Sequence, residues 1–243
     1  MKVEIYSDVV CPWCYIGKAR FERALGAFPQ GEDVEVVYRP FQLDPSAPDE
    51  PRPHREVLAA KFGPRAAAMD DRIAELGAAE GLTFAFDDAL ENNTLLAHRL
   101  LRFALDEYGA DAQARLKGRL MADHFSGGKD VGDPEHLAEA AAAEGLDPAR
   151  VSAFLAGDEL RAEVLAEVEE ARALGITAVP TFVFEGKWAV QGGQETSTFL
   201  QVLEQVAEET AQASEPEPVR TTGTGADAAP DADDCADGVC EVR

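Results

Sequence analysis

Two short segments near the N-terminus alternate apolar and polar residues. Residues 2–7 and 34–39 show this alternation and contain β-branched side chains, a pattern that is typical of strands. Residues 12–27 lie between them and suit a helix that begins at Pro12, because a proline at the first helical position loses no hydrogen bond. The pattern therefore predicts that the chain begins with a β-α-β unit.

The middle of the chain, from residue 54 to residue 174, has helical periodicity throughout. Residues 45–53, which precede it, are rich in proline and aspartate and are predicted to form a loop. The expected helix starts are Asp87-Asp88, Asp133-Pro134 and Asp147-Pro148, and the expected helix ends are Gly81, Gly109 and Gly145.

Strand-like residues return after this helical region. Residues 181–184 and 187–190 are mostly apolar and flank Glu185-Gly186, which predicts a hairpin. Residues 195–210 follow with an apolar stripe at helical spacing, so we expect a helix there. The predicted order of elements is β-α-β, then helices, then β-β-α.

Residues 211–243 differ in composition from the rest of the chain. They contain no leucine, isoleucine, methionine or aromatic residue, and their acidic residues outnumber the basic ones. Because such a segment cannot bury enough apolar surface to offset the entropy of ordering, we expect a flexible acidic tail. The predicted division is residues 1–44 and 175–210 as two halves of one fold, residues 45–174 as a helical insertion, and then the tail.

The overall composition is that of a globular enzyme. The chain has 243 residues, of which 46% are hydrophobic, which is enough for one substantial core. It has no apolar run of about 18 residues that would suggest a membrane-spanning helix, and its first residues lack the pattern of a signal peptide. We therefore expect a cytoplasmic protein, in which paired cysteines indicate redox or metal chemistry rather than structural disulfides.

The chain is strongly acidic. Its 46 acidic and 22 basic residues give a formal net charge of −24. Nucleic acids and anionic membranes would be repelled by this charge, so we expect neither as a partner. The same field raises the pKa of any thiol, so a reactive cysteine needs local groups that stabilise its thiolate.

Cys11-Pro12-Trp13-Cys14 follows the first predicted strand and opens the first predicted helix. Two cysteines at this spacing can form or open a disulfide and so exchange two electrons with a partner thiol pair. At a helix N-terminus, free N–H groups favour the thiolate of Cys11, which is the attacking species. The alternative is one half of a zinc site, although the Pro-Trp pair and the strand-to-helix position favour exchange.

Five groups of residues within residues 1–210 form a more specific combination than the two cysteines alone. They are Ser7-Asp8-x-x-Cys11-Pro12-Trp13-Cys14, Arg39-Pro40-Phe41-x-Leu43, Asn93-Thr94-x-x-Ala97-His98-Arg99, Gly175-Ile176-x-x-Val179-Pro180-Thr181-Phe182 and Gly192-Gly193-Gln194. Together they resemble the DsbA family, and specifically its FrnE-like branch. The resemblance implies an α/β, thioredoxin-like fold with a helical insertion. It also implies a dithiol–disulfide oxidoreductase in which Cys11 attacks, Cys14 resolves the mixed disulfide and a cis Pro180 lies beside them.

The resemblance also implies the kind of substrate. We expect proteins that contain thiols or disulfides, with Pro12, Trp13 and Val179 as contact residues. No cofactor or metal is expected, and glutathione or a thioredoxin-type partner is a candidate electron donor. Kappa-class glutathione transferases and 2-hydroxychromene-2-carboxylate isomerases share much of the pattern but lack the paired cysteines. A glutathione-dependent isomerase or transferase is therefore the alternative function.

Several other residues have two interpretations each. Asp8 could relay a proton or cap a turn, and Arg39 could lower the pKa of Cys11 or pair with a local carboxylate. Asn93 and His98 are five residues apart and do not share one helix face, so His98 is expected to make a buried hydrogen bond or helix-packing contact rather than to border a ligand groove. None of the four histidines is at metal-ligand spacing from another.

Cys235 and Cys240 lie in the predicted tail, and some FrnE-like proteins also carry an extra cysteine pair near the C-terminus. The hypothesis is that this pair closes a local disulfide and exchanges electrons with Cys11 and Cys14, which a flexible tether would allow. A passive disulfide and a zinc site built from all four cysteines are the alternatives.

Overall fold

The computed structural model describes residues 1–214, and its centre is a sheet of four strands. β1 (Lys2–Ser7) runs parallel to β2 (Glu35–Pro40) and antiparallel to β5 (Thr181–Phe184), which pairs with β6 (Trp188–Gln191). The order across the sheet is β2-β1-β5-β6. Cys235 and Cys240 lie outside the described residues.

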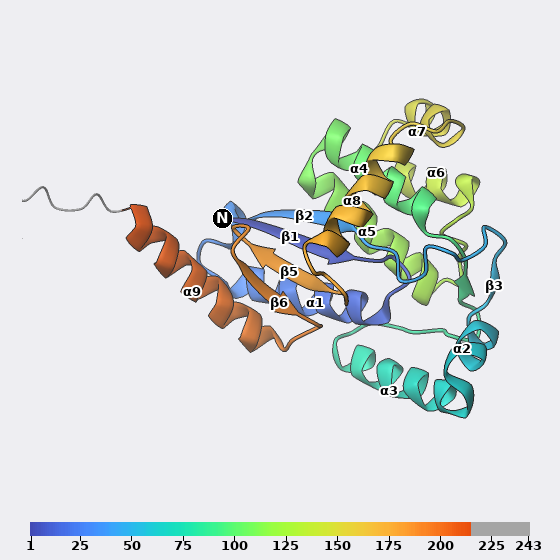
Figure 1. The fold of residues 1–243 in the computed structure, drawn as a ribbon, viewed down its shortest axis with the longest axis horizontal. Coiled ribbons are helices and arrows are strands. Elements are labelled where there is room, and N and C mark those ends of the chain that lie inside the picture. The colour runs from blue at the N-terminus through green and yellow to red at the C-terminus, as the bar shows by residue number, and fades with distance from the viewer. Residues whose placement is uncertain (215–243) are drawn as a thin grey trace, which may run out of the picture.

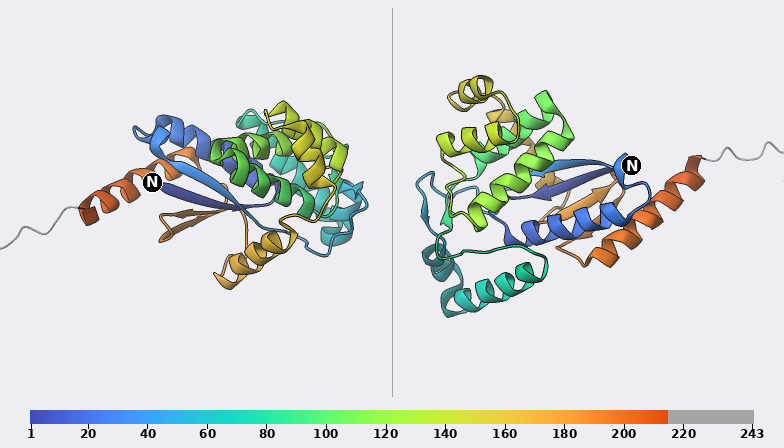
Figure 2. Two further views of the ribbon diagram at one scale, coloured as in Figure 1. Left: turned by 90° about the horizontal axis from the view of Figure 1, so that it is seen from above. Right: turned by 180° about the vertical axis from the view of Figure 1, so that it is seen from behind.

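Alternation along β1 sends successive side chains to opposite faces of this sheet. Val3 and Ile5 pack with Phe21 of α1 (Pro12–Ala27) and with α9 (Thr196–Ser214), whereas Tyr6 packs on the other face with Ala171. Figure 2 shows α1 and α9 on one face of the sheet and α8 (Arg161–Ala173) on the other. The sheet therefore lies between helices, and β1 is buried in its interior.

The helical insertion divides into two groups. α4 to α7 pack around their own apolar core, whereas α2 and α3 lie apart from them, beside the start of α1 (Figure 1). A short ladder of β3 and β4 connects the second group to the body. The elements of the insertion are β3 (Arg52–Pro53), α2 (His54–Phe62), α3 (Ala66–Ala79), β4 (Leu90–Glu91), α4 (Leu95–Tyr108), α5 (Ala110–Phe125), α6 (Pro134–Ala143), α7 (Pro148–Leu155) and α8 (Arg161–Ala173), and short 3₁₀ turns occur at Gly31–Asp33 and Gly63–Arg65.

Most of the elements expected from the sequence are confirmed. The first strand and the first helix have the predicted bounds, the hairpin forms around Glu185 and Gly186, and both of these residues have positive φ. Asp133 and Asp147 start α6 and α7, each accepting hydrogen bonds from the first helical N–H groups. None of the helices in residues 1–214 is long and apolar enough to cross a membrane.

Apart from shifts of one residue, two boundaries differ from the prediction. Asp87-Asp88 starts no helix, because the N–H of Asp88 bonds to Ala85 in a turn that leads into β4. The helix α4 begins only at Leu95, whose N–H bonds to the side chain of Asn93. The final helix, α9, continues to Ser214, four residues past the predicted end at residue 210.

Candidate functional site

The two cysteines lie where β1 feeds into α1. Cys11 is the N-cap residue of this helix and Pro12 its first residue, as the sequence predicts. The N–H of Cys14 donates to the carbonyl of Cys11 at 3.0 Å, which folds the first turn and brings the two side chains together. Both are present as free thiols, and they are 4% and 2% exposed respectively.

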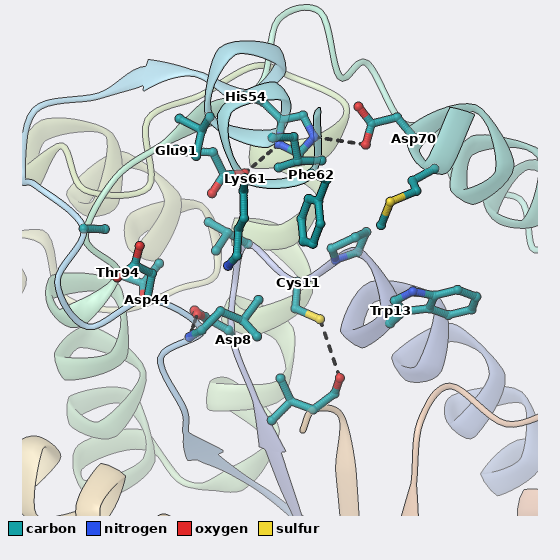
Figure 3. A pocket seen from close by; sticks show the side chains of 18 of the residues that line it. Asp8, Cys11, Trp13, Asp44, His54, Lys61, Phe62, Asp70, Glu91 and Thr94 are labelled. Atoms are coloured by element: carbon teal, nitrogen blue, oxygen red, sulfur yellow. Dashed lines mark hydrogen bonds and ion pairs between the residues drawn. The ribbon is translucent and has the colours of Figure 1, made fainter. Parts of the chain in front are cut away.

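The predicted proline lies beside them. The Val179–Pro180 bond is cis, and the Cys11 Sγ donates to the Val179 carbonyl at 3.8 Å (Figure 3). A Cβ at Gly17 would lie 3.1 Å from Pro180 Cγ, so the glycine in α1 permits the close approach of the loop that carries the proline. The loop that carries Pro180 therefore lies against the start of α1, next to Cys11.

A hydrogen bond between the two thiols moves their pKa values in opposite directions. The hydrogen bond to Cys14 holds the proton on Cys11 and, together with burial, raises the pKa of Cys11 well above its usual value. Burial raises the pKa of Cys14 as well, but the hydrogen bond from Cys11 and the charge of Lys117 outweigh it and lower this pKa. The two titrations are linked through this hydrogen bond, so the apparent pKa values belong to the pair.

Lys117 is a functional candidate that the sequence did not reveal. It lies on α5, is 0% exposed, and donates from Nζ to the carbonyl of Ser7 at 3.4 Å. Burial lowers its pKa to about 8, although the neighbouring Cys14 and Asp8 favour the charged form. Lys117 thus supplies the local positive charge that a thiolate needs in so acidic a protein.

Asp8 is buried and fully hydrogen-bonded. Its carboxylate accepts from the N–H groups of Val9 and Leu43, both at 2.8 Å, and lies 3.0 Å from His98 Nε2. Burial raises the pKa of Asp8, but the bond from His98 outweighs it and the pKa is lowered. The turn-capping interpretation of Asp8 and the buried hydrogen-bonding role of His98 are both confirmed.

Arg39 pairs with local carboxylates, which is the second of the two roles expected for it. Its Nε donates to Glu4 Oε1 at 2.8 Å, and its Nη1 lies 3.8 Å from Glu167 Oε2. The guanidinium therefore pairs with two local carboxylates on the β2 side of the sheet. Lys117, not Arg39, is the cation that acts on the cysteines.

A cavity of about 370 Å³ opens beside Cys11, between the start of α1 and the α2–α3 group (Figure 3). Cys11 lines it and Cys14 does not, so an incoming disulfide meets Cys11 first. The predicted contact residues Pro12, Trp13 and Val179 all line this cavity. Four of the large apolar side chains that remain exposed gather at its wall, namely Trp13, Leu43, Phe62 and Met69.

The far wall of the cavity carries a buried charge cluster. His54 Nδ1 lies 2.6 Å from Glu91 and its Nε2 lies 3.2 Å from Asp70 (Figure 3). Burial lowers the pKa of His54, but these two carboxylates outweigh it and raise the pKa. Because both ring nitrogens face acceptors, His54 is an imidazolium that links α2, α3 and β4. Within residues 1–214, no group of three or more potential ligands is arranged to hold a metal ion.

The arrangement resembles that of known proteins. A model of the DSBA-like thioredoxin domain matches residues 2–204. The Bacillus subtilis protein YwbO is 30% identical over 206 residues, which cover 83% of this chain and 94% of YwbO.

Many solved structures are similar, and two of them span a range of sequence identity. A probable DsbA oxidoreductase from Streptomyces coelicolor is 40% identical, with a TM-score of 0.79 and coverage of 86% of this chain and 91% of that one. The cytosolic disulfide reductase DsbM from Pseudomonas aeruginosa, in a structure with GSH, is 21% identical, with a TM-score of 0.59 and coverage of 88% and 99%. At this low identity, the similarity to DsbM shows a shared fold.

Proposed function

This chain belongs to the family of DSBA-like thioredoxin domains, and we propose that it is a thiol–disulfide oxidoreductase that reduces or isomerises protein disulfides through Cys11 and Cys14. The observation that carries the proposal is the position of Cys11. It lines an open cavity, its sulfur bonds to the carbonyl next to a cis proline, and its partner thiol lies directly behind it. The arrangement is also compatible with the FrnE-like branch.

The position of Cys11 at the cavity sets the order of the two exchange steps. The proton on Cys11 passes to Cys14, and the Cys11 thiolate attacks a substrate disulfide at the cavity. One substrate sulfur leaves as a thiolate and takes a proton from solvent. Cys14 then loses its proton and attacks Cys11, which releases the second substrate sulfur and leaves a Cys11–Cys14 disulfide. Two electrons have passed from the protein to the substrate.

The wall of the cavity favours polypeptide substrates. Trp13 on α1 and Met69 on α3 both line the cavity and are 40% and 41% exposed. Covering such apolar surface contributes roughly 25 cal/mol per Å². A segment of extended protein with apolar side chains near its cysteine would therefore gain more from this wall than a small polar disulfide would.

We further propose a cytoplasmic location and the use of glutathione or a thioredoxin-type partner to restore the dithiol. A reducing compartment favours reduction and isomerisation over net oxidation. DsbM, which shares the fold, is a cytosolic disulfide reductase whose structure contains GSH. In this proposal the chain itself needs no bound cofactor.

Cys235 and Cys240 fit the same proposal as a second redox pair. The 21 residues from Ser214 to Cys235 can span up to about 70 Å when extended. That reach exceeds the size of a compact domain of this length, whose radius of gyration is about 17 Å, so a return of the pair to Cys11 is sterically possible. Titrating the four thiols against glutathione buffers separates one redox couple from two. Truncation after residue 214 with an unchanged rate and potential would exclude the exchange.

Insulin reduction tests the proposed function. The wild-type protein should reduce insulin disulfides in the presence of a thiol donor, and Cys11→Ser should abolish the activity. The matched substitution Cys14→Ser should permit attack but block release, so that turnover stops after one addition. Retention of the main activity in Cys11→Ser would instead support a glutathione-dependent isomerase or transferase.

A further inference from the structure

A second large cavity, of about 290 Å³, lies beside the first turns of α4 and α8. These two helices pack against each other (Figure 1). The volume is close to the lower end of the range for ligand pockets, which begins at about 300 Å³. Its walls include Asp49, Asn93, Leu96, Arg99 and Arg161. None of these residues lines the cavity beside Cys11, so the second cavity is separate from the proposed substrate site.

Arg99 brings a buried guanidinium to the second cavity. The residue is 3% exposed, its Nε donates to the carbonyl of Glu159 at 2.9 Å, and its Nη2 donates to the carbonyl of Gly157 at 2.6 Å. Its Nη1 donates to no group within residues 1–214. The two carbonyls hold the guanidinium in place but carry no net charge. A buried guanidinium that keeps a free donor and has no carboxylate partner is suited to bind an anion.

Arg161 brings a second positive charge to the same cavity. It is the first residue of α8, and its side chain forms no ion pair in the part of the chain that the structure describes. The charge of Arg161 opposes that of Arg99 and, after burial, is a cause of the lowered pKa of Arg99. Two like charges that face one cavity repel each other, so an anion between them would stabilise both.

The acidic side chains nearby leave these two charges without a partner. Asp49 lines the cavity but is exposed to solvent. Asp158 and Glu159 favour the charged form of Arg99 only through space, and Glu159 already pairs with Arg150 at 2.9 Å. A strongly acidic protein therefore contains a cavity in which positive charge is locally in excess.

The start of α4 adds a hydrogen-bond donor to the cavity. The N–H of Leu95 bonds to the side chain of Asn93. Leu96 lines the cavity, and its N–H donates to no group among residues 1–214. Free N–H groups at a helix start, together with the positive end of the helix dipole, favour anions and phosphate groups in particular. The cavity thus combines two guanidiniums with the N-terminus of a helix.

We propose that the second cavity binds a small molecule through a phosphate group, and that Arg99 and Arg161 are its binding cations. A phosphate monoester carries a charge of about −1.5 to −2 at pH 7 and three strong acceptor oxygens, which match two guanidiniums and a helix N–H. A carboxylate carries one charge and leaves one guanidinium unneutralised. A cavity of about 290 Å³ has room for a phosphate with a small organic part. The two sources of the group are therefore a phosphorylated metabolite and inorganic phosphate.

This anion site adjoins the wall of the cavity beside Cys11. Asn92 and Thr94 line that cavity, whereas Asn93 between them lines the anion site. The Asn93 side chain donates to the carbonyl of Ala47 at 3.1 Å, and its N–H donates to the carbonyl of Pro48 at 2.9 Å. A ligand that binds only the folded arrangement opposes local opening. Phosphate should therefore slow hydrogen exchange of the Asn93 amide.

Calorimetric titration of the full-length protein at pH 7 and low salt tests the proposal with inorganic phosphate, glycerol 3-phosphate and acetate. Both phosphates should bind, and acetate should bind about tenfold more weakly or not at all. Arg99→Met and Arg161→Met should each weaken phosphate binding about tenfold because each removes charged hydrogen bonds. Asp49→Asn should strengthen it by removing a negative charge from the cavity.

The matched control is Arg65→Met, which removes the same charge from an exposed residue of the 3₁₀ turn Gly63–Arg65, away from the anion site. It should bind phosphate like the wild-type protein. Arg161 is exposed and its side chain holds no other group, so Arg161→Met decides the matter even if Arg99→Met fails to fold.

Each outcome supports or overturns the proposal. Tighter binding of glycerol 3-phosphate than of inorganic phosphate supports a phosphorylated metabolite, and equal binding supports inorganic phosphate. If neither binds, if acetate binds as tightly, or if Arg161→Met and Arg65→Met have equal affinities, the proposal is wrong. An unchanged Asn93 amide would place the ligand elsewhere. Binding is measured without turnover, so the result is independent of whether the protein reduces disulfides.

Discussion

Replacing His54 tests quantitatively how strongly a buried charge holds the far wall of the substrate cavity together. Its imidazolium links Asp70 on α3 to Glu91 on β4, and its ring stacks on Phe86 at 4.8 Å between centroids. His54→Phe keeps an aromatic ring in that stack and removes the positive charge. The substitution therefore isolates the electrostatic contribution from the packing contribution.

The size of the effect depends on the hydrogen bonds and hydration that Asp70 and Glu91 keep when His54 is replaced. Asp70 is 1% exposed but keeps its bond to Arg55 at 2.9 Å, whereas the side chain of Glu91 is 17% exposed and can take up water. A hydrogen bond to a charged group contributes about 1.5–3 kcal/mol, and complete loss of a buried partner costs about 3–5 kcal/mol. Because one carboxylate is still paired and the other is hydrated, we expect His54→Phe to lower the free energy of unfolding by about 2–4 kcal/mol.

The loss should depend on pH in a defined direction. Burial lowers the pKa of His54 and its two carboxylates raise it, with a net rise above the ordinary value of 6.5. A group whose pKa is higher in the folded state stabilises most fully below its unfolded pKa, and this stabilisation is lost as the pH rises through the folded pKa. The difference between wild type and His54→Phe should thus be largest near pH 6 and shrink at alkaline pH.

Urea unfolding from pH 6 to pH 9 measures this difference, and amide hydrogen exchange in α2 and α3 locates it. The control is Asp87→Asn, which removes the exposed carboxylate that pairs with Arg55 and should change stability by less than about 1 kcal/mol. Equal stabilities for His54→Phe and Asp87→Asn at pH 6, or a difference that does not vary with pH, would refute the interpretation of His54 as a charged link.

Three further predictions concern the substrate, the proline and the buried carboxylate. Met69→Ala should raise KM for insulin several-fold but leave the rate with hydroxyethyl disulfide unchanged; equal effects on both would remove Met69 from substrate binding. Gly17→Val should displace Pro180, 3.1 Å from even a Cβ, and so lower kcat and stability together; calorimetry and insulin turnover measure both, and wild-type values would show that the contact is not needed. Asp8→Asn weakens the bond to His98 and should lower the free energy of unfolding by about 2–4 kcal/mol in urea titrations at pH 7; a loss below about 0.5 kcal/mol would contradict the buried charge pair.

The sequence predicted the parts of the site that depend on local chain geometry. Cys11 as a helix cap, Cys14 one turn later and Pro180 at the start of a hairpin all follow from short patterns or from motifs carried by the family. The fold follows in the same way, because alternation in strands and spacing in helices record which faces are buried. The sequence offered turn capping as one of two roles for Asp8 and a buried hydrogen bond as one role for His98. It did not indicate that these two side chains bond to each other.

The sequence could not predict the residues whose role depends on packing between distant elements. Lys117 lies between Arg115 and Arg119 in α5, which are both exposed, and the only local sign of its burial is that it shares a helix face with Leu120 and Met121. Its burial results from the packing of α5 against β2 behind the dithiol. The charge that Lys117 places near Cys14 was not foreseen either, whereas the helix N-terminus at Cys11 was.

The most direct test of the central claim is to trap the covalent intermediate. The full-length Cys14→Ser protein, mixed with an excess of a disulfide-containing protein and alkylated, should yield a mixed disulfide at Cys11 that peptide mass spectrometry identifies. Cys11→Ser should yield no adduct at Cys14 under the same conditions, because Cys14 does not line the substrate cavity. An adduct on Cys14, or insulin reduction that survives Cys11→Ser, would contradict the assignment of Cys11 as the attacking thiol.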